Sequence, residues 1–149
     1  MLLYLDLNCF NRPFDNQSQS RIAEETAAVL EVLQRIVDGT DRLAWSEILA
    51  YENSRSPLAD RRQEIGTWAD RSALVVPVDD TVTARARELN ARGLHPLDAA
   101  HVASAERAGC EVFLTCDDRL LRRANRTPTS LRLLTPVQYL QGDEHDQDA

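Results

Sequence analysis

Short apolar segments alternate with helical segments along this chain, and this alternation constrains its fold more than any other feature. Each apolar segment is three or four residues long, as expected of a buried strand. The predicted strands are Leu2–Leu5, Leu43–Trp45, Leu74–Val76, Val112–Leu114 and Leu131–Leu134. Strands joined through helices need crossover connections, so the pattern predicts an α/β protein: a three-layer α/β/α sandwich with a mostly parallel central sheet.

The segments between the strands carry helical periodicity. The clearest runs from Gln19 to Val37, where apolar residues recur at three-and-four spacing and Gly39 stands just past the end. Its predicted apolar stripe is Ile22, Thr26, Val29, Leu30, Leu33, Ile36 and Val37. Further predicted helices are one capped by Ser46 that runs through Glu52 until Pro57, and those from Ala59 to Arg71, Asp79 to Arg92 and Pro96 to Ala108. Residues 11–17 are predicted to form a loop.

Length and composition indicate one globular domain. The 149 residues, 43% of them hydrophobic, suffice for one core, which we assign to residues 1–141, with a disordered acidic tail at 142–149. No basic region precedes an apolar stretch and no run of 18 apolar residues occurs, so neither a signal peptide nor a membrane span is expected. Three cysteines without CxxC spacing favour a reducing, cytoplasmic setting.

The charged residues exclude several functions. A formal net charge of −7 argues against a surface that coats nucleic acid broadly, although a local basic patch is compatible with it. All 17 basic residues are arginine and lysine is absent. A Walker phosphate loop, a Schiff-base enzyme and a phospho-receiver domain each require a lysine, so these classes are excluded.

Four acidic residues follow or flank the predicted strands: Asp6, Glu52, Asp98 and Asp117. In an open parallel sheet, ligands bind beyond the carboxyl ends of the strands. Taken singly, Asp98 and Asp117 are explained by helix capping and the helix dipole. Asp6 has no predicted helix directly after it, and burying it unpaired would be costly. Together the four carboxylates would repel one another without a cation, so the set predicts a site for Mg²⁺ or Mn²⁺, which prefer oxygen ligands.

The second carboxylate is open to two assignments. Glu47 and Glu52 lie five residues apart in one predicted helix, so they do not share a helical face well. We prefer Glu52 as the inner residue and keep Glu47 as a supporting carboxylate. His101, one turn after Asp98, is interpreted first as a histidine packed in an alanine-rich helix, with assistance in proton transfer as the second interpretation.

Four ordered motifs resemble those of the PIN-domain nucleases, and among them the VapC-type toxins of toxin–antitoxin pairs. The resemblance spans Leu2 to about Leu140. The motifs are Tyr4-Leu5-Asp6-Leu7-Asn8, Trp45-Ser46-Glu47-Ile48-Leu49-Ala50-Tyr51-Glu52, Pro96-Leu97-Asp98-Ala99-Ala100-His101-Val102-Ala103 and Phe113-Leu114-Thr115-Cys116-Asp117-Asp118. One departure is Leu7, which stands where many relatives have threonine.

The resemblance implies a metal-dependent endoribonuclease with an RNA substrate, an antitoxin partner and a homodimeric assembly. It assigns the catalytic and metal-binding roles to Asp6, Glu52, Asp98 and Asp117. Asn8 and Thr115 are the implied supporting polar groups, and we keep Asp118 with them as a further supporting carboxylate. Arg12 and Arg119 stand beside the first and fourth motifs and are expected to hold phosphates, although solvated positions would explain them equally well.

Two other functions are weighed against the nuclease. A catalytically silent PIN fold that serves as a protein-interaction module is compatible with the change at Leu7. A haloacid-dehalogenase-type phosphatase also begins with an aspartate after the first strand. It is disfavoured because Asn8 stands where that chemistry needs a second aspartate and because lysine is missing.

Overall fold

The computed structural model describes the backbone of residues 1–148 and the side chains of residues 1–142. The elements, in chain order, are β1 Leu2–Leu5, α1 Leu7–Asn11, the 3₁₀ helix η1 Arg12–Phe14, α2 Ser20–Val37, β2 Arg42–Ser46, α3 Glu47–Ser54, α4 Ala59–Gly66, α5 Trp68–Arg71, β3 Leu74–Val76, α6 Asp80–Ala91, α7 Pro96–Arg107, β4 Val112–Leu114, α8 Asp118–Ala124, β5 Arg132–Leu134 and α9 Pro136–Asp148. Most of the predicted tail lies beyond the described side chains, so its disorder stays a prediction.

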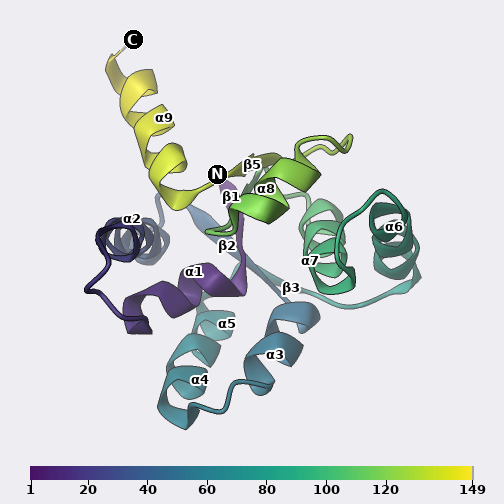
Figure 1. Cartoon of the computed structure of the whole chain (residues 1–149), viewed down its shortest axis with the longest axis horizontal. Coiled ribbons are helices and arrows are strands. Elements are labelled where there is room, and N and C mark those ends of the chain that lie inside the picture. Colours follow the sequence, from purple (N-terminus) through teal and green to yellow (C-terminus); the bar gives the residue numbers. More distant parts are fainter. Residues whose placement is uncertain (149) are drawn as a thin grey trace.

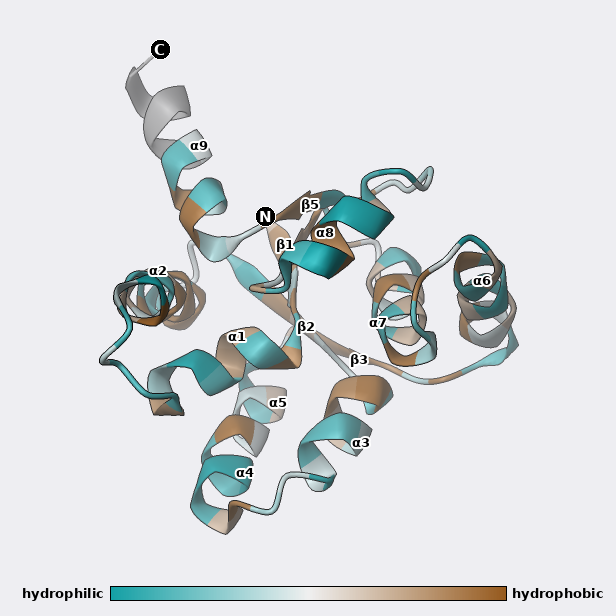
Figure 2. Ribbon diagram, viewed as in Figure 1, coloured by the Kyte–Doolittle hydropathy of each residue, from teal (hydrophilic) through white to brown (hydrophobic). Residues whose placement is uncertain are grey.

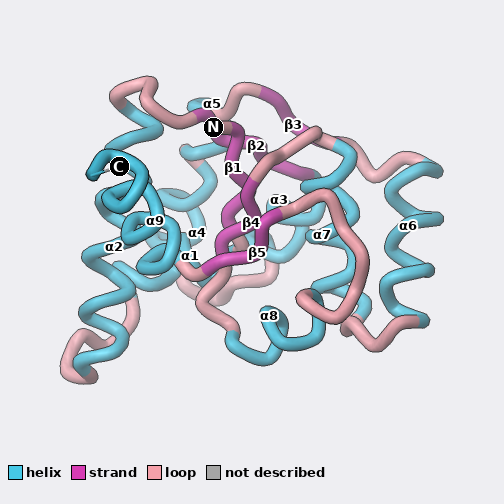
Figure 3. Tube along the Cα trace, turned by 90° about the horizontal axis from the view of Figure 1, so that it is seen from above, coloured by secondary structure: helices cyan, strands magenta, loops and turns pink. Residues whose placement is uncertain are grey.

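The five strands form one sheet in the order β3-β2-β1-β4-β5, and every described pair is parallel. The predicted fold class is therefore confirmed. Figures 1 and 3 show the sheet between two groups of helices, with α6 and α7 on one side and α2, α4, α5 and α9 on the other. In Figure 2 the brown, hydrophobic residues gather on the sheet and on the helix surfaces that face it.

The core lies on both faces of the central strand β1. Tyr4 stacks on Phe113 of the neighbouring strand, with ring centroids 5.3 Å apart, and both side chains are fully buried. Leu3 and Leu5 are equally buried. Such strands, covered on both faces, are continuous apolar runs, which is the feature by which the sequence analysis predicted them.

The strand order places a topological switch between β1 and β4. From β1 the chain adds β2 and β3 on one side and then crosses to add β4 and β5 on the other. The backbone N–H of Asp6 donates to the carbonyl of Leu114 over 2.9 Å, so the two strands end side by side. Their loops diverge from this point and leave room for a ligand.

Two local predictions are wrong at the end of β1. Residues 7–14, which include much of the predicted loop, form α1 and η1. Asp6 does have a helix to cap, because its side chain accepts a hydrogen bond from the N–H of Leu7 over 2.8 Å. A helix of five residues is too short to show an apolar repeat, so periodicity could not reveal it.

Two predicted helices also differ in detail. In α2, Leu30 and Val37 are 51% and 48% exposed, whereas Val32 is fully buried. The stripe that faces the core is thus narrower and slightly rotated from the predicted one. The helix predicted from Ala59 to Arg71 is divided at Thr67, whose hydroxyl donates to the carbonyl of Glu64 over 2.6 Å and favours a bend there.

None of the described helices is both long enough and apolar enough to cross a membrane.

The two leucines of α2 provide a test of the packing. Leu33 is 8% exposed within the core and Leu30 is 51% exposed on the same helix. We expect Leu33→Ala to lower the free energy of unfolding by about 2–4 kcal/mol because it leaves a cavity. Leu30→Ala should change it by less than about 1 kcal/mol. Urea unfolding measures both, and equal losses would contradict this orientation of α2.

Candidate metal centre

Asp6 is the most constrained carboxylate of the site. It is 5% exposed, directly beyond β1. Its Oδ2 accepts hydrogen bonds from the hydroxyl of Thr115 over 2.8 Å and from the amide nitrogen of Asn8 over 3.1 Å. Asn8 in turn accepts from the backbone N–H of Cys116 over 3.0 Å. Asn8 and Thr115 thus join the ends of β1 and β4 around one carboxylate.

Burial raises the pKa of Asp6, and the nearby charge of Glu52 raises it further, whereas His101 and the hydrogen bond from Thr115 lower it. The net direction is upward. The donors around Asp6 therefore compensate only part of the hydration that its carboxylate loses. A positive ion near Asp6 would stabilise the charged form.

Glu52 reaches the same place from α3. Its Oε2 lies 3.5 Å from Nε2 of His101, which is 1% exposed in α7. On the other side of the imidazole, Nδ1 is 2.7 Å from the hydroxyl of Tyr4, which is itself 2.7 Å from that of Ser46. A buried polar chain thus runs from the start of α3 through β1 to α7 and ends at Glu52.

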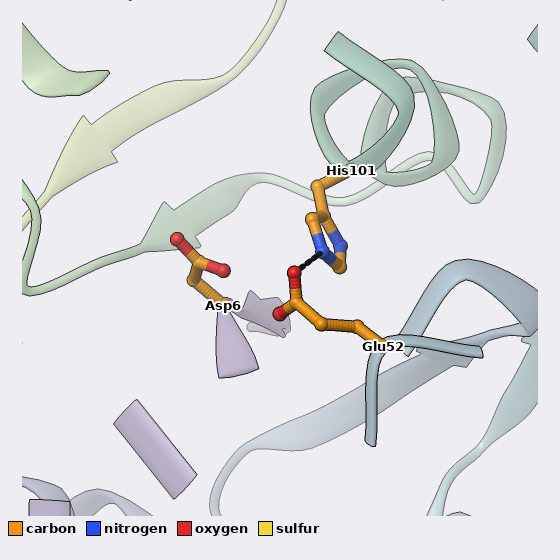
Figure 4. Close-up of side chains that lie close together, drawn as sticks. All are labelled: Asp6, Glu52 and His101. Atoms are coloured by element: carbon orange, nitrogen blue, oxygen red, sulfur yellow. Dashed lines mark ion pairs between the residues drawn. The ribbon is translucent and has the colours of Figure 1, made fainter. Parts of the chain in front are cut away.

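Asp6, Glu52 and His101 form a set of potential ligands. One donor atom from each lies within 4.8 Å of the others, and Figure 4 shows the two carboxylates and the imidazole directed toward a common space. Nε2 of His101 is buried without a hydrogen-bond partner. Burial alone would lower the pKa of His101, but Glu52 and Asp6 outweigh it, so this pKa lies above its ordinary value.

Asp98 and Asp117 complete the acidic edge. Asp98 is half-buried in the first turn of α7, and its pKa rises from 3.8 to about 6 because of burial and the charges of Asp6 and Asp117. Asp117 caps α8, with Oδ1 accepting from the backbone N–H groups of Arg119 and Leu120. Its own N–H donates to Thr115. Asp98 and Asp117 are thus close enough to act on one another electrostatically, but of the four predicted carboxylates only Asp6 and Glu52 join the potential ligand set among the described residues.

The other two predicted carboxylates point elsewhere. Glu47 is exposed, and its Oε2 accepts from the backbone N–H of Val78 over 2.9 Å. Asp118 is paired with Arg21 of α2 over 2.7 Å. Neither residue joins the potential ligand set around Asp6 among the described residues.

The two predicted substrate-binding arginines differ in their surroundings. Arg12 pairs with Asp15 over 2.9 Å and lies 3.5 Å from Glu25, so acidic groups of the protein already hold its guanidinium. Arg119 is exposed and lines a hollow of about 560 Å³ together with Asp117. Their contacts with a substrate stay predictions.

His101 and Tyr4 are the site residues whose importance the sequence understated. His101 is packed in α7, as interpreted, but it also faces Glu52. The spacing of Asp98 and His101, one helical turn apart, was the available sign, because it puts both side chains on one face of the helix. No sequence feature indicated a role for Tyr4 at the site, since a tyrosine in a buried strand is usually an ordinary core residue.

The chain belongs to the PIN domain family, whose model matches residues 3–126. No curated protein sequence matches the chain significantly. Because the chain belongs to the PIN family, the haloacid-dehalogenase-type phosphatase is no longer a candidate function.

Solved structures share the fold at low sequence identity. The chain is similar to VapBC from Salmonella typhimurium bound to DNA, with 19% identity, a TM-score of 0.58 and coverage of 91% of this chain and 99% of that chain. It is also similar to FitAcB from Neisseria gonorrhoeae, with 16% identity, a TM-score of 0.58 and coverage of 91% and 98%. A third similar structure is VapBC2 from Rickettsia felis bound to a DNA fragment from their promoter, with 15% identity, a TM-score of 0.56 and coverage of 89% and 97%.

The raised pKa of Asp98 predicts a pH-dependent stability. The folded chain binds this proton more tightly, with a pKa of about 6 against an ordinary 3.8, so deprotonation destabilises the metal-free fold as the pH rises through this interval. We expect Asp98→Asn to stabilise the protein by about 1–2 kcal/mol at pH 7, allowing for solvent screening. The gain should vanish near pH 4 or below.

Urea unfolding in EDTA between pH 4 and 7.5 would measure this effect. Asp80→Asn is the matched control, because Asp80 is exposed in the first turn of α6. That variant should lose up to about 0.5 kcal/mol through the helix dipole at every pH in this range. An Asp98→Asn protein no more stable than wild type at pH 7 would show that Asp98 is not repelled by its neighbours.

Proposed function

We propose that this protein is a divalent-metal-dependent endoribonuclease, the VapC-type toxin of a toxin–antitoxin pair. The observation that carries the proposal is the convergence of Asp6 and Glu52, with Asp98 and Asp117 beside them, at the carboxyl edge between β1 and β4. Membership of the PIN family supports a nuclease.

The residues present fit a hard divalent cation. Asp6, Glu52, Asp98 and Asp117 offer carboxylate oxygens, which Mg²⁺ and Mn²⁺ prefer. Burial, together with the charges of neighbouring carboxylates, raises the pKa of Asp6 and of Asp98, so a bound cation would stabilise their charged forms. A bound ion would supply the positive charge that stabilises a phosphodiester as it is hydrolysed and that makes nearby water more acidic.

The surrounding residues would orient this carboxylate set. Thr115 and Asn8 hold one oxygen of Asp6, so its carboxylate is directed before any ligand binds. His101, fixed by Tyr4 on its far side, restrains Glu52. Such preorganisation reduces the rearrangement needed when the phosphodiester is bound, water attacks its phosphorus and the 3′ oxygen leaves.

The toxin assignment rests on likeness. The four motifs resemble those of VapC-type toxins, and the similar folds come from VapBC and FitAcB structures. We infer an antitoxin protein partner and a homodimeric assembly on this basis. The three free, buried cysteines fit a reducing compartment, so we place the activity in the cytoplasm.

Asp6→Asn tests the catalytic assignment. Asparagine is as good a helix cap as aspartate, and its one oxygen can still accept from the backbone N–H of Leu7, so the fold should persist. Loss of the charge should lower Mn²⁺-dependent cleavage of RNA by at least about a hundredfold. Gel analysis of cleavage, with circular dichroism to check folding, makes the measurement, and Asp80→Asn should cleave like wild type.

Two results would decide against this proposal. Undiminished cleavage by a folded Asp6→Asn protein would remove Asp6 from the reaction. A folded wild type that neither binds Mn²⁺ at millimolar concentration nor cleaves RNA would favour the silent interaction module instead.

A second pair of variants separates the two candidate glutamates. Glu52→Gln should weaken Mn²⁺ binding by at least about tenfold, because it removes one of the two innermost charges. Glu47→Gln should bind like wild type, since glutamine can still accept from the N–H of Val78. Isothermal titration calorimetry compares them, and the opposite ranking would make Glu47 the ligand.

A further inference from the structure

Four arginines gather on one side of α8 and the turn after it. Arg119, Arg122, Arg123 and Arg126 together line a hollow of about 250 Å³. Arg122 and Arg123 lie three and four residues after Arg119, which puts these three on one helical face, and Arg126 follows in the turn beyond the helix. We call them the α8 arginine cluster, and Figure 2 shows the outer surface of this helix in teal, the colour of hydrophilic residues.

The four cluster arginines stand together without the acidic partners that six other arginines of the described residues have. Arg85, for example, is held by both Glu88 and Glu106. Among the residues whose side chains are described, no carboxylate is ion-paired with any of the four cluster arginines. Like charges three and four residues apart destabilise a helix. In a chain of net charge −7, such a concentration of unpaired positive charge calls for a function.

The helix dipole explains only part of the cluster. Arg122 and Arg123 lie in the last turn of α8, where positive charge is favourable. Arg119 lies in the first turn, where the dipole disfavours it. Arg126 lies beyond the helix end. An anionic ligand accounts for all four positions.

The cluster is continuous with the carboxylate site. Arg119 and Arg122 also line the larger hollow of about 560 Å³, which contains Asp117. Two other arginines that line this hollow are already ion-paired within the protein. Arg12 and Arg21 lie 3.5 and 3.4 Å from Glu25, which is 4% exposed. The cations left for a ligand beside Asp117 are those of α8.

We propose that the α8 arginine cluster binds consecutive phosphates of a single-stranded RNA whose scissile bond lies at the carboxylate site. This inference rests on the proposed nuclease function and adds the course of the substrate, which runs from Asp117 along α8 toward Arg126. Guanidinium groups bind phosphate oxygens in a bidentate manner. From Arg119 to Arg126 the chain advances on the order of 10 Å, enough to reach two or more consecutive phosphates of one strand.

The test measures RNA binding without cleavage. A fluorescently labelled single-stranded RNA of mixed sequence is titrated with the full-length protein in EDTA at several KCl concentrations, and anisotropy gives Kd. We expect Arg122→Gln/Arg123→Gln/Arg126→Gln to weaken binding at least about tenfold at low salt. The slope of log Kd against log salt should fall by about 2, because each lost phosphate contact contributes about 0.7.

The matched control removes the same charge from the opposite side. Arg42 and Arg132 begin β2 and β5, and Arg71 ends α5 shortly before β3, so all three lie at the amino edge of the sheet. Arg42→Gln/Arg71→Gln/Arg132→Gln should keep the wild-type salt slope. If the triple cluster variant fails to fold, Arg126→Gln alone, outside the helix, should reduce the slope by about 0.7.

Three results would overturn the inference. The first is an unchanged Kd and slope in the cluster variant, and the second is an equal loss in the control, which would reflect net charge alone. The third is cluster-dependent binding of duplex DNA in preference to RNA, which would assign the cluster to a DNA partner. Cleavage by the wild type with Mn²⁺ is scored separately, so cluster-dependent RNA binding without cleavage would reject the nuclease and leave the phosphate site standing.

Discussion

The burial of one carboxylate, Asp6, shapes the rest of the site. Asp6 is 5% exposed at the end of the central strand, so it loses most of its hydration and must be held by donors from the protein. Those donors come from both sides of the switch between β1 and β4: Leu7 and Asn8 follow one strand, and Thr115 follows the other. The same bonds that satisfy Asp6 therefore also fasten the two strand ends to each other.

Around Asp6 the protein accumulates more negative charge than its own donors compensate. His101 is the only basic group in the potential ligand set of the described residues, and its pKa is raised by the carboxylates that it faces. Asp98 shows this destabilisation most clearly, since burial, together with the charges of Asp6 and Asp117, raises its pKa to about 6. Proteins commonly accept such local destabilisation where function needs it. A bound cation would neutralise this negative charge, because the carboxylates that repel one another would then share it as a ligand partner.

Positive charge is distributed just as unevenly. Among the described residues, six arginines are ion-paired with carboxylates of the protein, and the nearly buried Glu25 holds two of them at the rim of the larger hollow. The arginines of α8 remain unpaired beside Asp117. The acidic surface as a whole would repel a polyanion, so a phosphate backbone could approach favourably only along a local basic strip such as this one.

The fold class was predictable from local sequence patterns, because short buried strands that alternate with helices leave few solutions other than a parallel sheet. It also predicted that acidic residues from distant segments would meet, since parallel strands present their carboxyl ends at one edge. Asp6 and Asp117 were foreseeable for this reason.

Which side chains point inward depends on how the helices pack against the sheet, and this could not be predicted from local patterns. Glu47 and Glu52 share one helix, and the packing of α3 against α7 turns Glu52 toward His101 and leaves Glu47 at the N–H of Val78. The sequence also gives no sign of the ion pair between Arg12 and Glu25 or of the hydrogen bond between Tyr4 and His101. Each depends on how helices rotate and pack around the sheet, and local sequence patterns define the elements without defining those rotations.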